Sequence, residues 1–189
     1  MGLNLITKVE YKAYVGITSP NEDVIIDSLI PKVSQLIKSY CRRTFIDYVN
    51  ESKVERFNGG DLFYLKEYPI LAVDSVEYST DYGQTYTSLT NYTDWVLDAS
   101  DDAIKPISAS TFQVLVNGYK VTYAGGYETL PEDLKLAVFD LVTYYRKNDS
   151  AVHSSKAPGT NTVQIEYIST TNLPAHIKRV LDLYVTDYT

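Results

Sequence analysis

Cysteine and histidine are scarce in this sequence. Its 189 residues include one cysteine, Cys41, and two histidines, His153 and His176. A single cysteine can form neither an intramolecular disulfide nor a thiolate metal cluster, and the two histidines are not spaced as a metal-binding pair. We therefore expect no metal site and no cofactor, and the lone cysteine is compatible with a reducing cytoplasm.

The sequence also lacks a net positive charge and long apolar runs. The formal net charge is −7, and basic residues cluster only in short pairs such as Arg42-Arg43. General nucleic-acid binding is disfavoured, because phosphates require clustered Lys and Arg. No stretch approaches the roughly 18 apolar residues of a membrane span, and residues 1–15 lack the apolar core of a signal peptide. We expect a protein made in the cytoplasm, with no membrane partner.

Catalytic motifs are missing as well. Ser154-Ser155-Lys156 faintly resembles a serine–lysine pair, but it lies in a polar stretch that cannot preorganise a nucleophile. Asp98, Asp101 and Asp102 have oxygens that suit a hard cation, yet the ordered spacing of a calcium loop is absent, and a solvated turn is the favoured interpretation. We expect no catalytic residues and no enzyme activity.

Tyrosine is the abundant residue type. The sequence has 18 tyrosines against 5 phenylalanines and 1 tryptophan. A tyrosine ring packs as an apolar body while its hydroxyl still needs a partner. The excess is therefore typical of strand surfaces or of hydrated protein–protein contacts.

Two long helices are expected. Ser19-Pro20 predicts the start of a helix over about 20–41, which Pro31 should kink or divide. Pro131 predicts a second helix over about 131–147. Each helix has an apolar stripe that it cannot bury alone, so we expect the two to pack together. The stripe of the first helix comprises Ile25, Leu29, Val33, Leu36 and Tyr40.

A short helix and several strands accompany them. Thr7 to Glu10 predicts the capping box of a helix that Gly16 ends. Asn117-Gly118 supplies the positive φ angles of a tight hairpin. The expected strands are residues 53–57, 62–65, 73–78, 95–97, 111–116 and 119–123. The expected fold is α+β, a helical bundle of two long helices plus short terminal helices with an antiparallel β-hairpin or sheet portion.

The C-terminal part is expected to be separate from a main domain, residues 1–147. Residues 148–161 are polar and predict a linker, and residues 162–189 predict a strand followed by a helix. The alternation of the strand suits addition to the sheet edge of another chain, whereas the segment can also fold back on its own domain. The candidate interface residues are Val163, Ile165, Tyr167, Ile177, Val180, Leu181 and Tyr184.

Four segments in this order carry a family resemblance. They are Leu5–Ile17, a short helix ending in Gly and an apolar residue; Ile26–Phe45, a long helix finishing in Tyr-Cys-Arg-Arg-Thr-Phe; Leu65–Ile70 with Val73 and Val76; and Val121–Tyr127 followed by Leu130–Lys135. The sequence resembles the phage head–tail connector family, the head-completion or adaptor proteins of long-tailed phages.

The resemblance implies a structural protein of the virion head–tail interface. It implies a ring, commonly of about twelve copies, with head-to-tail contacts between neighbours. Its partners would be the portal protein, neighbouring copies of itself, and a tail, stopper or tail-completion protein. DNA would pass through without sequence-specific binding. On this view residues 1–147 are the connector domain, and the resemblance leaves the role of the C-terminal segment open. From its linker and its apolar positions, we expect this segment to anchor the domain to the portal or to a neighbouring subunit.

One alternative remains from the residues themselves. A tyrosine-rich carbohydrate-binding or baseplate accessory module would use exposed aromatic rings to stack on a glycan. Expected helices at both ends of the chain argue against it, because such modules are usually all-β.

Overall fold

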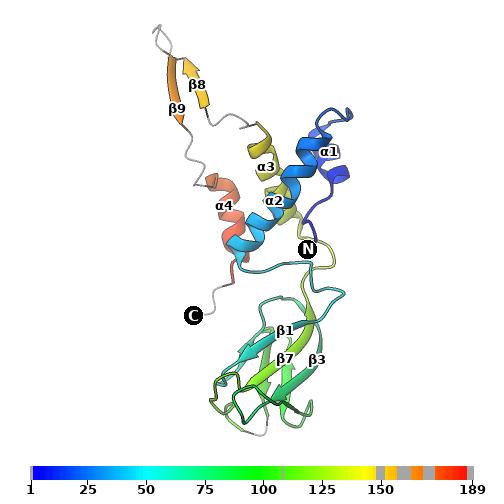
Figure 1. The fold of residues 1–189 in the computed structure, drawn as a ribbon, viewed down its shortest axis with the longest axis vertical. Coiled ribbons are helices and arrows are strands. Elements are labelled where there is room, and N and C mark those ends of the chain that lie inside the picture. The colour runs from blue at the N-terminus through cyan, green and yellow to red at the C-terminus, as the bar shows by residue number, and fades with distance from the viewer. Residues whose placement is uncertain (1, 108, 148–151, 157–162, 168–172, 187–189) are drawn as a thin grey trace. The chain divides into compact units, whose positions relative to one another are not determined.

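The computed structural model describes residues 2–107, 109–147, 152–156, 163–167 and 173–186 (Figure 1). The chain divides into two compact units, each assembled from segments that are distant in the sequence. The β-rich unit comprises residues 1–3, 43–130 and 186–189, and the helical unit comprises residues 4–42 and 131–185.

The described strands of the β-rich unit form two antiparallel sheets. One sheet has the order β1 (Lys53–Phe57), β7 (Tyr119–Gly125), β3 (Ile70–Tyr78) and β4 (Thr87–Ser88). The other has the order β2 (Phe63–Tyr64), β6 (Ala103–Pro106) and β5 (Trp95–Asp98). Both sheets contribute side chains to one core, so they pack on each other. The core comprises Phe63, Leu65, Val76, Trp95, Ile104, Phe112, Tyr119, Val121 and Tyr123.

The helical unit is built around α2. Its helices are α1 (Lys8–Val15), α2 (Asp23–Cys41), α3 (Glu132–Lys147) and α4 (Ala175–Leu181), and a 3₁₀ turn, η1 (Asp182–Tyr184), follows α4. Helix α2 contacts α1, α3 and α4, and α3 also contacts α4. Strands β8 (Val152–Lys156) and β9 (Val163–Tyr167) pair with each other as a separate antiparallel hairpin.

The expected bundle of two long helices with an attached β portion is wrong. Helices α2 and α3 do contact each other, but α1 and α4 pack against the same pair. The strands build two sheets with their own core rather than an accessory hairpin. The sequence understates this part because β2 and β4 have two residues each, too few to show alternation.

Local helix signals were more reliable. The Thr7 side chain accepts from the Glu10 N–H at 3.2 Å, and the Glu10 carboxylate accepts from the Thr7 N–H at 2.8 Å, which confirms the capping box. Gly16 ends α1 with a φ of 72°, as expected. Helix α2 begins at Asp23, later than expected, and it continues through Pro31 without a break in its helical assignment.

The apolar stripe expected on α2 is largely wrong. The buried apolar side chains of this helix are Ile26, Ile30, Val33, Ile37 and Cys41. Ile25 and Leu36, by contrast, are 45% and 37% exposed. Helix α2 carries apolar residues over a wide arc, so spacing alone did not decide which edge of that arc faces the core.

The expected hairpin around Asn117 is also wrong. Asn117 does form a tight turn, with a φ of 53° and a hydrogen bond from the Gly118 N–H to the Leu115 carbonyl at 2.8 Å. However, β1 and β3 occupy the two edges of β7, so residues 111–116 cannot pair with it. Phe112 instead exchanges backbone hydrogen bonds with Gly60, at 2.8 and 3.0 Å.

Candidate functional site

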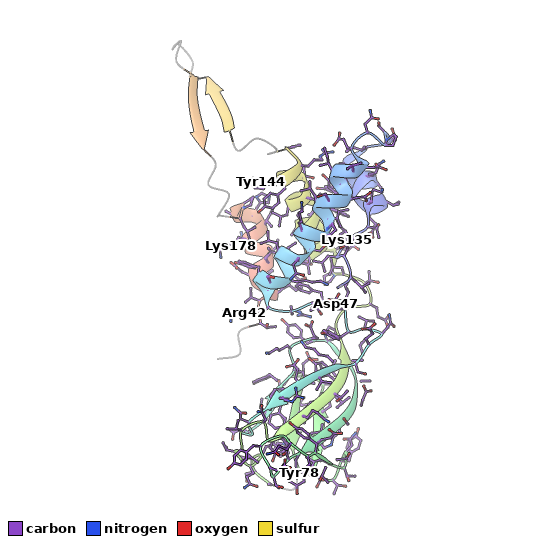
Figure 2. The ribbon with its side chains drawn as sticks, in the orientation of Figure 1. Arg42, Asp47, Tyr78, Lys135, Tyr144 and Lys178 are labelled. Carbon is purple, nitrogen blue, oxygen red and sulfur yellow. The ribbon has the colours of Figure 1, made fainter. Side chains whose placement is uncertain are left out.

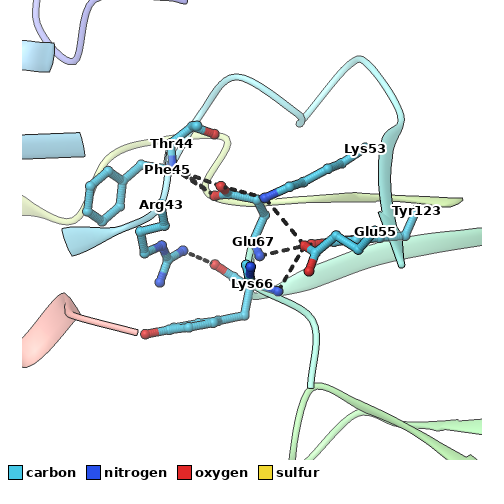
Figure 3. Close-up of polar contacts among 9 residues, drawn as sticks. Arg43, Thr44, Phe45, Lys53, Glu55, Lys66, Glu67 and Tyr123 are labelled. Carbon is cyan, nitrogen blue, oxygen red and sulfur yellow. Dashed lines mark hydrogen bonds and ion pairs between the residues drawn. The ribbon is translucent and has the colours of Figure 1, made fainter. Parts of the chain in front are cut away.

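A buried polar cluster of the β-rich unit centres on the carboxylate of Glu67 (Figure 3). One carboxylate oxygen accepts from the backbone N–H of Thr44 at 2.8 Å, and the other accepts from that of Phe45 at 3.2 Å. The ammonium of Lys53 lies 3.1 Å from the same carboxylate. Glu67, in the segment that follows β2, thereby holds the backbone of Thr44 and Phe45 in place.

Arg43 lies beside this cluster and is 2% exposed. Its guanidinium carbon lies 3.8 Å from the centroid of the Tyr68 ring, 4.8 Å from that of Phe45 and 5.2 Å from that of Tyr127. The guanidinium also donates to the Tyr68 carbonyl. Aromatic faces attract a cation through their quadrupole. Arg43 is therefore held by three rings, as a structural anchor of the same segment.

Tyr123 completes the cluster. Its hydroxyl donates to Glu55 and accepts from the Glu67 N–H at 3.0 Å. Lys53 also lies 3.3 Å from a Glu55 oxygen. Burial, with the nearby Glu55 carboxylate, raises the pKa of Tyr123 far above its usual value, so the hydroxyl remains a donor. These groups satisfy one another, and the cluster acts as a structural tie.

A lysine bridges two carboxylates of the acidic turn that contains Asp98, Asp101 and Asp102. The ammonium of Lys105 lies 2.6 Å from Asp98 and 2.8 Å from Asp101, and these contacts raise its pKa. Lys105 and Ser100 lower the pKa of Asp98. Asp102 accepts from the Ile70 N–H at 3.0 Å. Within the described residues, no group of three or more His, Cys, Asp or Glu side chains is arranged to hold a metal ion.

Two cavities open on the β-rich unit. One has a volume of ≈ 450 Å³ and is lined by residues 2–3 and by residues of the loop 46–51. The other has a volume of ≈ 250 Å³, with the buried rings of Phe112 and Tyr119 in its lining and Tyr78 beside them. The lining of the second cavity also includes the polar residues Asp94, Thr111 and Gln113.

The candidate interface residues fall into two groups. Val163, Ile165 and Tyr167 occupy alternate positions of β9, which is paired with β8. On α4, Ile177 and Leu181 are buried in the helical unit, whereas Val180, and Tyr184 in the following turn, are half-buried. Of the expected linker, residues 148–151 and 157–161 lie outside the described part of the chain, and 152–156 form β8.

The packing of α4 explains the burial of Ile177 and Leu181. The Cys41 thiol lies 3.7 Å from the Leu181 carbonyl, and the Tyr184 hydroxyl donates to Asp133 at 2.7 Å. Helix α4 is therefore tied to both α2 and α3. The sequence pattern of α4 identified an apolar face, but it could not show that this face is covered by the chain's own helices.

Helix α2 has a surface that the sequence argument missed. Ile25 and Leu36 are exposed, and Leu29 between them is half-buried. The sequence did indicate such a surface, because α2 has more apolar residues than one core-facing stripe needs.

Among the described helices, none combines the length and the apolar character that crossing a membrane requires.

The chain matches one protein-family model and resembles several solved structures. A family model described as "Head completion protein" matches residues 4–186. A chain from the "Neck of empty GTA particle computed with C6 symmetry" superposes with a TM-score of 0.61 at 16% identity, covering 98% of this chain and 91% of that one. A chain from the "Virion of native gene transfer agent (GTA) particle" gives 0.60 at 15%, with the same coverage.

A third chain, from the "Neck of native GTA particle computed with C12 symmetry", gives a TM-score of 0.54 at 19% identity and covers 100% of this chain and 97% of that one. At these identities the likeness shows a shared fold. No curated protein matches the chain.

The family model defines the class as structural head–tail connector proteins, and the shared fold agrees with it. The chain belongs to the head completion protein family. The resemblance to phage head–tail connectors is confirmed, and the match favours it over the carbohydrate-binding or baseplate alternative.

Proposed function

We propose that this chain is a connector subunit that forms a ring beneath the portal, extends the DNA channel and docks the tail. The observation that carries the proposal is the head completion match over residues 4–186. The solved neighbours, which come from particle necks computed with C6 and C12 symmetry, support an arrangement of several copies. A closed ring requires each copy to offer two different, complementary surfaces.

The distribution of charge supports passage of DNA rather than its binding. The β-rich unit holds 6 Lys and Arg against 14 Asp and Glu, a formal charge of −8, and the helical unit holds 11 against 10, a charge of +1. An acidic surface repels phosphates, whereas a basic one would hold them. We infer that the β-rich unit faces the DNA path.

The C-terminal segment is the proposed contact with the portal or with a neighbouring subunit. The hairpin β8–β9 is a separate two-stranded sheet, and such a sheet is marginally stable by itself. Pairing with a sheet edge of another chain would stabilise it. Val163, Ile165 and Tyr167 are the proposed contacts on β9. Val180 and Tyr184, which are half-buried on the C-terminal helix and turn, are proposed as further contacts. Ile177 and Leu181 are buried in the helical unit and are not available to a partner.

The connector function is tested by removing the protein from the particle. Without it, DNA-filled heads and free tails should accumulate unjoined, and the purified full-length chain should restore joining when added to them. Tailed, infectious particles in the absence of the chain would refute the proposal.

The C-terminal contact is tested by a matched pair of variants. Val163→Ser, Ile165→Ser and Tyr167→Ser combined should abolish capture by purified portal while leaving the melting temperature unchanged. Gln164→Ser and Glu166→Ser, at the intervening positions, should retain capture. Equal capture by both variants would place the contact elsewhere.

A further inference from the structure

Helix α2 has a second apolar face that the described structure leaves uncovered. Ile25, Leu29 and Leu36 are four and seven residues apart, which places them on one side of the helix. Ile25 and Leu36 are 45% and 37% exposed. We call these three residues the α2 outer stripe. Lys32 is exposed on the same side of the helix.

A second surface lies on α1 and α3. The Tyr14 ring stacks on Phe139 with centroids 4.7 Å apart, and its hydroxyl donates to Asp140 at 2.9 Å. Leu136 precedes Asp140 by one helical turn and is 48% exposed, and Tyr14 is 46% exposed. Tyr14, Leu136 and Asp140 form the α1–α3 patch. Both surfaces lie outside the buried contact between α2 and α3, so one does not cover the other within the chain.

The charges on the two surfaces are complementary. The Lys32 ammonium donates to the Ser28 hydroxyl at 2.9 Å and makes no ion pair with any described residue. Asp140 accepts from the Tyr14 hydroxyl, and among the described residues no cationic group lies within ion-pair distance of it. Several other charges of this unit are paired, and Lys135 on α3, labelled in Figure 2, lies 2.7 Å from Glu10. A lone cation beside one apolar surface and a lone anion beside the other match across an interface.

We propose that the α2 outer stripe of one copy docks on the α1–α3 patch of the next copy, with Lys32 facing Asp140. The two surfaces differ, so the contact is head-to-tail, which is the kind that closes a ring. The inference rests on the proposed connector function, and it names the surfaces through which neighbouring copies meet.

The test uses the full-length chain mixed with purified portal rings, with bound copies counted by native mass spectrometry. Ile25→Lys and Leu36→Lys should each weaken association between copies at least about tenfold, because a charge would replace an apolar contact. Val24→Lys is the matched control, since Val24 is 81% exposed on the same helix but off the stripe. All three variants should keep the wild-type circular dichroism spectrum and melting temperature.

Charge reversal gives an independent test. Lys32→Glu and Asp140→Lys should each weaken association, and the double variant should recover most of it, because the reversed pair attracts again. Failure of the double variant to recover would exclude the Lys32–Asp140 contact.

The outcomes separate this inference from the proposed function. If Ile25→Lys and Leu36→Lys assemble as Val24→Lys does, the copies meet elsewhere and the inference is overturned while the ring stands. If these variants associate with one another but no longer bind portal, the stripe is a portal site and the inference is again overturned. If the wild-type chain remains a single copy on the portal, the proposed ring itself fails.

Discussion

The buried carboxylate of Glu67 accepts a hydrogen bond from the backbone N–H of Thr44, at 2.8 Å, and so ties the residues that follow α2 to the segment after β2. Glu67→Gln should lower the free energy of unfolding by about 1–3 kcal/mol, because backbone donors and Lys53 lose a charged acceptor. Urea unfolding measures the change, with the exposed Glu51→Gln as control. Equal stability of the two variants would contradict the role of this tie.

The two faces of α2 make opposite predictions for neighbouring residues. Ile37 is fully buried, so Ile37→Ala should cost about 2–5 kcal/mol of unfolding free energy. Leu36 is 37% exposed, so Leu36→Ala should cost less than about 1 kcal/mol in the isolated chain. Thermal or urea unfolding of both variants measures the difference. A larger loss at Leu36 than at Ile37 would reverse the assignment of the faces.

Helix α4 is predicted to stabilise the helical unit. Truncation after Gly159 removes Ile177 and Leu181, which are buried against the rest of that unit. The melting temperature should fall, since losing even one such buried side chain costs about 2–5 kcal/mol. Differential scanning calorimetry measures the change. A truncated chain that melts as the full chain does would show that α4 is separable from the core.

The loop after β3 has a carboxylate that should respond to acid. Asp81 accepts hydrogen bonds from the Ser79 hydroxyl at 2.6 Å and from the Thr85 hydroxyl at 2.7 Å, and these lower its pKa well below its usual range. A folded-state pKa below the unfolded one stabilises the fold above the unfolded pKa, and the contribution is lost as the pH falls through the folded value. NMR titration of the Asp81 carboxyl carbon should show a midpoint below that of Asp81 in the unfolded chain. An ordinary midpoint would exclude these bonds in solution.

Local chemistry was predictable from the sequence. The Thr7–Glu10 capping box, the Gly16 helix end and the start of α3 after Pro131 depend on residues a few positions apart, and the structure confirms them. The family resemblance was recognisable for a related reason, since it depends on the order of such local motifs.

Pairing over long sequence separations was not predictable. Asn117 forms its turn, but the partners of β7 are β1, more than sixty residues upstream, and β3. The apolar arc of α2 includes both Leu36 and Ile37, and the packing of the other helices on α2 decides which of them is buried. The Glu67 cluster brings together residues 43–45, 53, 55, 67 and 123, and no short motif marks it.

Electron microscopy of the intact particle, reconstructed without imposed symmetry, tests the central claim most directly. We predict density for several copies of this chain, arranged as a closed ring between the portal and the tail around the DNA path. A single copy, or density for the chain away from the head–tail joint, would contradict the account.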